Sequence, residues 1–256
     1  GRLRADACGA DLFSRHSTPY FGDMTQRIYC AIGDIHGELD RLKDLHDQLA
    51  FHVRKHLRDA DVTLVHLGDL IDRGQDSCGV VDYLIDLEAR MGPRAVTLRG
   101  NHEQMMIEAV REQNAESRSH WLEWGGEETM DSYRRRGLDG PPDHHLDWLQ
   151  SLPTLHHDTE QGLVFVHAGV DPDNFPDCGE RVQMWTRRKD FFDARCWTSP
   201  DLVGQTVVHG HSPTEDNEPD VAHGGRRINV DTGAVYGGQL TAAILVPGKA
   251  PTFLHS

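Results

Sequence analysis

Side chains able to bind metal ions follow several short apolar runs of this sequence, at the point where each run ends. The runs cover residues 27–32, 62–67, 95–98, 163–166 and 206–208, and the polar residues after them are Asp34, His36, Asp69, Asn101, His102, His167 and His211. Imidazole nitrogens together with carboxylate and amide oxygens suit manganese, iron or zinc better than magnesium or calcium. The residue types therefore predict a divalent metal site.

The number of candidate ligands favours two metal ions. Six ligands are more than a single catalytic ion with open positions would use, but they fit two ions that share a carboxylate. The expected assignment is one ion on Asp34 and His36, a second on Asn101, His167 and His211, and a bridge between them by Asp69. Two ions roughly 3.5–4 Å apart can clamp a phosphoryl group and lower the pKa of a water between them.

The apolar runs predict an α/β fold that brings these side chains together. The first three runs are each followed by an amphipathic helical pattern, which is typical of parallel strands joined by right-handed helical crossovers. Further strands are expected at 163–166, 206–208, 227–230 and 239–246. Because the carboxyl ends of such strands open into a common crevice, the scattered polar residues should form one site.

Two segments depart from this alternation. Residues 1–23 are expected to be an expression tag or a loose native arm, so that residues 24–256 form a single catalytic domain. Residues 117–153 are polar, carry three tryptophans and end in a short helical pattern. We expect this second stretch, the cap segment, to be a helical insertion over the edge of the sheet.

Composition excludes several classes of function. Lys and Arg number 26 against 41 Asp and Glu, and the net charge of −15 disfavours nucleic acid and anionic membranes as partners. No run approaches the roughly 18 apolar residues of a membrane helix, so we expect a cytoplasmic protein. We also expect it to be a monomer. The five scattered cysteines contain no Cys-x-x-Cys pair, which argues against a disulfide framework and against a thiolate zinc site.

Six short blocks surround the candidate ligands, in the order GDIHG (33–37), GDLIDRG (68–74), RGNHEQMM (99–106), VHAG (166–169), GHSP (210–213) and DTGAV (231–235). This set resembles the phosphoprotein phosphatase superfamily of metallophosphoesterases, above all the bacterial and bacteriophage-lambda type serine/threonine protein phosphatases. The resemblance covers roughly residues 27–246. It implies the calcineurin-like metallophosphoesterase fold, a central β-sandwich flanked by helices (α/β/β/α) with a small helical cap.

The resemblance also implies roles for individual residues. His102 corresponds to the general acid of the family, and Asp72 to the aspartate paired with it. Arg73, Arg99 and Arg187 match phosphate contacts. The implied mechanism is direct attack on phosphorus by a hydroxide that bridges two metal ions, while His102 protonates the leaving oxygen. Manganese is the expected metal, with iron or zinc as alternatives.

The leading prediction for function is a phosphoserine and phosphothreonine phosphatase that acts on phosphorylated proteins or peptides. A first alternative is a diadenosine tetraphosphate hydrolase, which shares the dimetal core. The family resemblance implies alanine at Asp72 and aspartate at Glu103 in that class, so both positions favour the protein phosphatase. A second alternative is a pseudoenzyme that only binds phosphoproteins, although no ligand is missing. The role of His209, two residues before His211, stays open.

Overall fold

The computed structural model describes residues 26–112 and 114–256. The leader or tag predicted at residues 1–23 lies outside this range. No helix in the described part of the chain is both long and apolar enough to cross a membrane.

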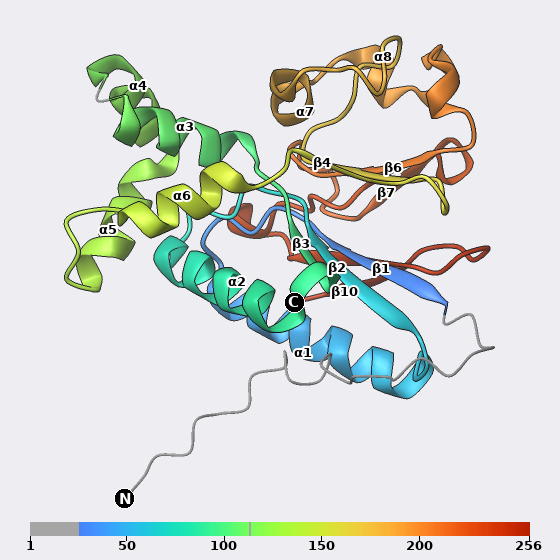
Figure 1. Cartoon of the computed structure of the whole chain (residues 1–256), viewed down its shortest axis with the longest axis horizontal. Coiled ribbons are helices and arrows are strands. Elements are labelled where there is room, and N and C mark those ends of the chain that lie inside the picture. The colour runs from blue at the N-terminus through green and yellow to red at the C-terminus, as the bar shows by residue number, and fades with distance from the viewer. Residues whose placement is uncertain (1–25, 113) are drawn as a thin grey trace, which may run out of the picture.

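Strands form two sheets, which lie face to face (Figure 1). Their bounds are β1 Arg27–Ile32, β2 Asp61–His66, β3 Ala95–Thr97, β4 Leu155–Asp158, β5 Leu163–Val166, β6 Thr206–His209, β7 Asp220–Ala222, β8 Arg227–Asn229, β9 Thr241–Leu245 and β10 Thr252–His255. The first sheet has the order β10-β9-β1-β2-β3 and the second β4-β5-β6-β8-β7. Strands β1, β2 and β3 run parallel, as do β5, β6 and β8, and the remaining strands pair antiparallel.

Helices cover the outer faces of both sheets and one end of the molecule (Figure 1). Their bounds are α1 Leu39–His56, α2 Ser77–Met91, α3 Asn101–Arg111, α4 Ala115–Trp121, α5 Glu127–Arg135, α6 Asp143–Ser151, α7 Glu180–Trp185 and α8 Lys189–Phe192. A π-helical turn, η3 (Leu122–Gly126), joins α4 to α5. Short 3-10 turns are η2 Gly92–Arg94, η4 Ala194–Cys196, η5 Pro200–Leu202, η6 His223–Gly225 and η7 Ala234–Tyr236.

Successive side chains of β1 face two different apolar layers. Ile28 and Cys30 point to the outer face, where they belong to the core that α1 and α2 cover. Tyr29 and Ala31 point the other way and pack with Phe165 of β5 between the two sheets. Because successive side chains of a strand face opposite sides, each central strand contributes to two apolar layers.

A third apolar core lies on the outer face of the second sheet, where Val164 and Val207 pack with Phe191 of α8. The order of layers is therefore helix, sheet, sheet, helix, which confirms the predicted α/β/β/α fold. Much of the cap segment is helical, and α4, α5 and α6 pack against α2 and α3 (Figure 1).

Two buried histidines form a polar contact within the helix-covered core. His46 of α1 has its Nε2 3.1 Å from Nε2 of His66 on β2, and its Nδ1 2.8 Å from the hydroxyl of Tyr83. Burial lowers the pKa of His66 to about 4 and holds that of His46 well below its usual 6.5. Both imidazoles are therefore neutral in the folded protein at neutral pH.

We predict that acid destabilises the protein partly through His46. Because its pKa is depressed by folding, the unfolded chain takes up the proton first, and stability is lost as pH falls from about 6.5 towards the folded pKa. In urea titrations, His46→Gln should reduce the slope of unfolding free energy against pH, between pH 6 and 4, by up to about 1.4 kcal/mol per pH unit. Exposed His56→Gln is the control, and equal slopes for His46→Gln and the unaltered protein would contradict the prediction.

Candidate metal centre

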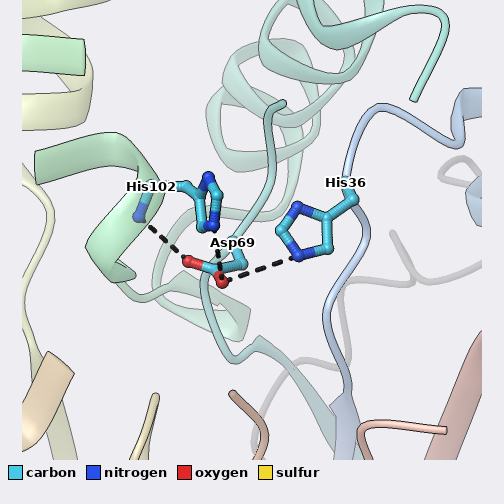
Figure 2. Close-up of side chains that lie close together, drawn as sticks. All are labelled: His36, Asp69 and His102. Carbon is cyan, nitrogen blue, oxygen red and sulfur yellow. Dashed lines mark hydrogen bonds and ion pairs between the residues drawn. The ribbon is translucent and has the colours of Figure 1, made fainter. Parts of the chain in front are cut away.

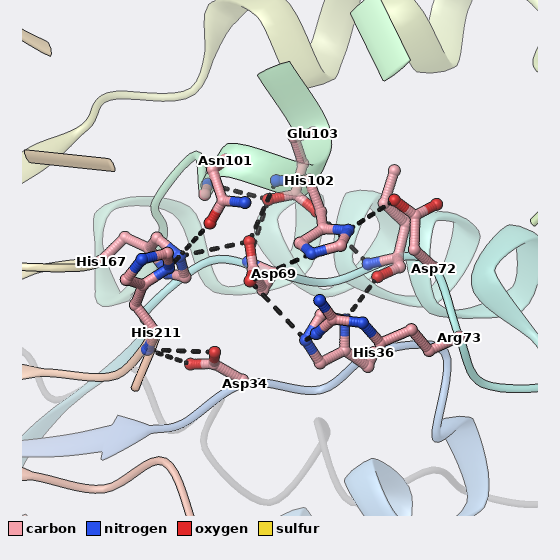
Figure 3. Close-up of polar contacts among 12 residues, drawn as sticks. Asp34, His36, Asp69, Asp72, Arg73, Asn101, His102, Glu103, His167 and His211 are labelled. Atoms are coloured by element: carbon pink, nitrogen blue, oxygen red, sulfur yellow. Dashed lines mark hydrogen bonds and ion pairs between the residues drawn. The ribbon is translucent and has the colours of Figure 1, made fainter. Parts of the chain in front are cut away.

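Most of the predicted site residues meet at the carboxyl ends of strands from both sheets (Figure 3). Eight of them line one pocket: Asp34, His36, Asp69, Arg73, Asn101, His102, Arg187 and His211. Two more are buried directly behind this lining, Asp72 against His102 and His167 against Asn101. Residues up to 177 positions apart in sequence thus come into contact, as between Asp34 and His211.

The carboxylate of Asp69 lies at the centre of the cluster (Figure 2). Its Oδ2 is 3.6 Å from His36 Nε2 and 3.9 Å from His102 Nε2, and its Oδ1 is 3.2 Å from His167 Nε2. Asp69 belongs to two groups of potential ligand atoms that each lie within 4.8 Å of one another, one with His36 and His102, the other with His167 and His211. A carboxylate shared by two such groups suits a pair of divalent cations.

Asn101 adds an oxygen to the second group. Its Oδ1 is 3.0 Å from Nε2 of His167, which in turn is 3.1 Å from Nδ1 of His211 (Figure 3). His167 Nδ1 contacts the carbonyl oxygen of Leu67 at 2.9 Å, so Nε2 is the atom left to face the pocket. Nitrogen and oxygen donors in this mixture fit manganese, iron or zinc.

Glu103 holds the loop that carries Asp69. This buried side chain accepts hydrogen bonds from the backbone N–H groups of Asp69, Gly100, Leu70 and Ile71, at 2.9, 2.8, 2.8 and 3.3 Å. A carboxylate that binds several N–H groups fixes a loop firmly, because each bond satisfies a buried donor. Gly100 has to be glycine, since a Cβ there would lie 2.3 Å from Oδ1 of Asp69.

Strained backbone concentrates at the pocket. Positive φ angles occur at His36 (45°), Asp69 (49°), Asp72 (72°), Arg73 (67°) and His211 (67°). Left-handed conformations of this kind cost about 1–3 kcal/mol each in residues other than glycine and persist where the surroundings enforce them. The fold therefore gives up stability to aim these side chains.

Asp34 contacts the second group of potential ligand atoms through the backbone N–H of His211. Both of its carboxylate oxygens lie within 3.1 Å of the His211 N–H, and Gly210 allows this approach because a Cβ there would lie 2.1 Å from Asp34 Oδ1. Burial, followed by the negative charge of Asp231, raises the pKa of Asp34 well above its usual value. A divalent cation nearby would favour the ionised carboxylate.

The imidazoles differ in charge. Burial lowers the pKa of His36 to about 3, so its ring is neutral, as a metal ligand must be. Burial also opposes the charged form of His167, but the Asp69 carboxylate outweighs it and raises the pKa of His167 to about 9. A metal ion that binds His167 therefore has to displace a proton, which makes its binding dependent on pH.

The cap segment fixes the pair of Asp72 and His102. His102 Nδ1 is 2.7 Å from Asp72 Oδ2, which leaves Nε2 directed at the pocket. Trp121 donates its indole N–H to both oxygens of Asp72, at 3.1 and 3.0 Å, and Thr129 donates its hydroxyl to Oδ1 at 2.8 Å. The sequence carried no signal for these two contacts, which depend on how α4 and α5 pack.

The three predicted phosphate-binding arginines differ in position. Arg73 and Arg187 line the pocket, with guanidinium nitrogens 2.7 Å from His36 Nε2 and 3.2 Å from His211 Nε2. Arg99 is outside the pocket lining and donates to Glu180 at 2.6 Å and to the carbonyl oxygen of Gln150 at 3.1 Å. Only the first two arginines are placed to meet a phosphate in the pocket.

His209 faces away from the pocket. Its Nε2 contacts the guanidinium of Arg227 at 3.0 Å, and its ring packs edge-on against Phe191 and Phe192. Burial lowers its pKa to about 3. Its position fits a buried structural histidine, which answers the question that the sequence left open.

Besides the predicted site residues, the pocket is lined by Trp124, Pro213, Asp231, Gly233, Ala234, Val235 and Tyr236. Asp231 lies in the DTGAV block, so its position could have been inferred from the motif. Tyr236 directly follows the same block, so its place beside the cleft could also have been inferred, whereas Trp124 lies in the cap segment and carries no such signal.

A family model for calcineurin-like phosphoesterases matches residues 29–239. The chain belongs to the calcineurin-like phosphoesterase family. The predicted recognition of a metallophosphoesterase is confirmed at this level, and the His and Asp groups described above could hold the metal ions.

Individual proteins that are similar to this chain differ in the substrates that their names give. The asymmetrical bis(5'-nucleosyl)-tetraphosphatase PrpE of Halalkalibacterium halodurans is 27% identical over 238 residues, covering 86% of this chain and 94% of the relative. A solved structure described as a candidate diadenosine tetraphosphatase is 24% identical, with a TM-score of 0.61 over 91% of this chain and 95% of that one. A serine/threonine phosphatase from Saccharomyces cerevisiae shares the fold, with 16% identity and a TM-score of 0.53 over 94% and 80% of the two chains.

The PrpE relative contradicts the leading prediction of a phosphoserine and phosphothreonine phosphatase, since it matches along nearly its whole length and is named as a bis(5'-nucleosyl)-tetraphosphatase. The prediction relied on Asp72 and Glu103. Both side chains are fully buried and neither lines the pocket, because Asp72 orients His102 and Glu103 binds backbone N–H groups. Neither side chain lines the pocket, so neither offers a direct contact that would select one substrate over the other.

We predict that Asp69→Asn lowers metal content and phosphoester hydrolysis together, because the amide removes the charge that both ligand groups share. Metal content after reconstitution with manganese is measured by mass spectrometry. Exposed Asp59→Asn serves as the matched control. Full occupancy by two ions in Asp69→Asn would contradict the bridging role.

Proposed function

We propose that this protein is a metal-dependent hydrolase that cleaves bis(5'-nucleosyl) tetraphosphates off-centre, into a nucleoside triphosphate and a nucleoside monophosphate. The observation that carries the proposal is similarity along nearly the full length of a bis(5'-nucleosyl)-tetraphosphatase named as asymmetrical. The reaction adds one water, forms one bond from its oxygen to phosphorus and breaks one phosphoanhydride bond.

The charge distribution supports a polyanionic substrate. The chain carries a net charge of −15, yet Arg73 and Arg187 both line the pocket. Their planar guanidinium groups can each make two hydrogen bonds to phosphate oxygens. Asp34, Asp69 and Asp231 also line the pocket, so it would attract phosphate groups once divalent cations offset these carboxylates, whereas the acidic remainder of the surface repels them.

The ligand set supports a pair of divalent cations. We assign Asp34 and His36 to one ion, Asn101, His167 and His211 to the other, and Asp69 to both, with manganese as the first choice. Divalent cations bound there would neutralise phosphate oxygens and lower the pKa of the attacking water.

The remaining side chains position the substrate and handle the proton. Arg73 and Arg187 hold the phosphate under attack, and His102 Nε2 donates a proton to the oxygen of the departing phosphate. Burial lowers the pKa of His102 to about 4, and the negative charge of a polyphosphate in the pocket would act in the opposite direction, towards the protonated ring. Asp72 keeps Nδ1 engaged at 2.7 Å, which directs Nε2 to the substrate.

We expect the manganese-loaded protein to convert diadenosine tetraphosphate to ATP and AMP in equal amounts. The products are separated and quantified by anion-exchange chromatography. Metal-stripped protein should form neither product. Formation of ADP alone would contradict off-centre cleavage. Absence of any product with metal content verified would contradict the proposed function.

We predict that His102→Asn lowers kcat for diadenosine tetraphosphate by about 10²- to 10⁴-fold, the range typical of losing a general acid. Metal content should stay near that of the unaltered protein, which separates this effect from that of Asp69→Asn. Exposed His56→Asn is the control for a histidine change as such. A kcat close to that of the unaltered protein would remove His102 from the mechanism.

A further inference from the structure

Exposed aromatic rings gather at the pocket. Among the described residues, the large apolar side chains with substantial exposure are Phe51, Trp124, Leu138, Val203, Val221 and Tyr236. Of the three aromatic ones, Trp124 is 43% exposed and Tyr236 is 62% exposed, and both line the pocket. Isolated exposed apolar side chains are ordinary, but two rings beside one charged pocket suggest a ligand with an aromatic part.

Trp124 stands beside the proton-handling histidine. Its ring centroid is 6.5 Å from that of His102 and 5.7 Å from that of His120. It belongs to η3, where the carbonyl oxygen of the adjacent Gly125 accepts the Arg73 N–H at 3.0 Å. This backbone contact holds the turn that carries Trp124 against the loop that carries Arg73.

Tyr236 stands beside the same arginine. The Arg73 guanidinium lies 5.4 Å from the centre of its ring. Tyr236 ends the turn η7 between Gly233 and Gly237, whose φ angles are 70° and 93°, and its N–H donates to the Gly233 carbonyl oxygen at 2.9 Å. This short turn presents the ring to solvent at the rim of the pocket.

The size of the pocket places a nucleoside at this rim. The pocket that the candidate metal ligands line together with Trp124 and Tyr236 holds about 40 Å³, room for a few water molecules. A phosphate group can enter this space, whereas a nucleoside attached to that phosphate is too large for it and has to extend past the exposed rings of Trp124 and Tyr236.

We propose that Trp124 and Tyr236 form a nucleobase-binding rim, on which a base of the substrate stacks while the polyphosphate enters the metal pocket. This inference rests on the proposed function. Stacking on aromatic rings is a general way to hold a base without reading its edges. The two rings thus give the site affinity for a nucleotide beyond that for its phosphates.

The test compares ATP with inorganic tripolyphosphate, which has phosphates but no base. Dissociation constants for both are measured by titration calorimetry on manganese-loaded protein, and the ratio is taken within each variant, so that changes in phosphate binding cancel. We expect the unaltered protein to bind ATP roughly 5- to 100-fold more tightly than tripolyphosphate, the range for base stacking. Trp124→Ala and Tyr236→Ala should bring the ratio towards one.

The experiment also includes conservative variants of both residues and a control variant at an aromatic residue outside the pocket. Trp124→Phe and Tyr236→Phe keep an aromatic face and should retain most of the preference for ATP. Phe51→Ala removes an exposed ring on α1 that lies outside the pocket, and should leave the ratio unchanged. Equal affinity for ATP and tripolyphosphate in the unaltered protein, or an unchanged ratio in both alanine variants, would overturn the rim.

Hydrolysis of diadenosine tetraphosphate is assayed separately on the same preparations. Failure to cleave it, together with a preference for ATP that depends on the two rings, would overturn the proposed function while supporting a nucleotide-binding rim. Cleavage without such a preference would support the proposed function and overturn the rim.

Discussion

Burial of the Asp69 carboxylate is the constraint on which the site depends. The residue is 2% exposed, and taking a carboxylate out of water costs several kcal/mol unless other groups compensate. Desolvation alone would raise its pKa, but the charge of His167 and the neighbouring imidazoles hold that pKa well below its usual value. Asp69 is thus ionised among nitrogen donors, an arrangement that a divalent cation completes.

The surrounding fold keeps this charge in place from three directions. Glu103 fixes the loop of Asp69 through backbone N–H groups, and the cap segment secures Asp72 through Trp121 and Thr129. His167 and His211 come from the second sheet, so the apolar layer between the sheets sets the spacing of the two ligand groups. Packing far from the pocket therefore controls its geometry.

Sequence reasoning worked where the signal was local. The strand at 27–32 was predicted with its observed bounds, and the glycine-rich blocks pointed to residues that the structure brings together, because a polar group directly after a buried strand is unusual. The edge strands β4, β7 and β10 were missed, since they are short and only partly buried. Their residues carry too little apolar alternation to distinguish a strand from a loop.

Tertiary contacts explain the other differences. Arg99 begins the RGNHEQMM block in sequence, but its side chain pairs with Glu180. Trp121 contacts Asp72 only because the cap segment folds back on α2 and α3. Substrate class was predicted from Asp72 and Glu103, which are conspicuous in sequence but buried in the structure. Of the two exposed rings that line the same pocket as the candidate metal ligands, Trp124 belongs to no motif, whereas Tyr236 directly follows the DTGAV block.

Anomalous X-ray scattering from crystals grown with manganese tests whether Asp69 is shared by two metal ions. We expect two manganese peaks, one on each side of the Asp69 carboxylate, the first near His36 and the second near His167 and His211. A single peak, or two peaks that do not share Asp69, would contradict it.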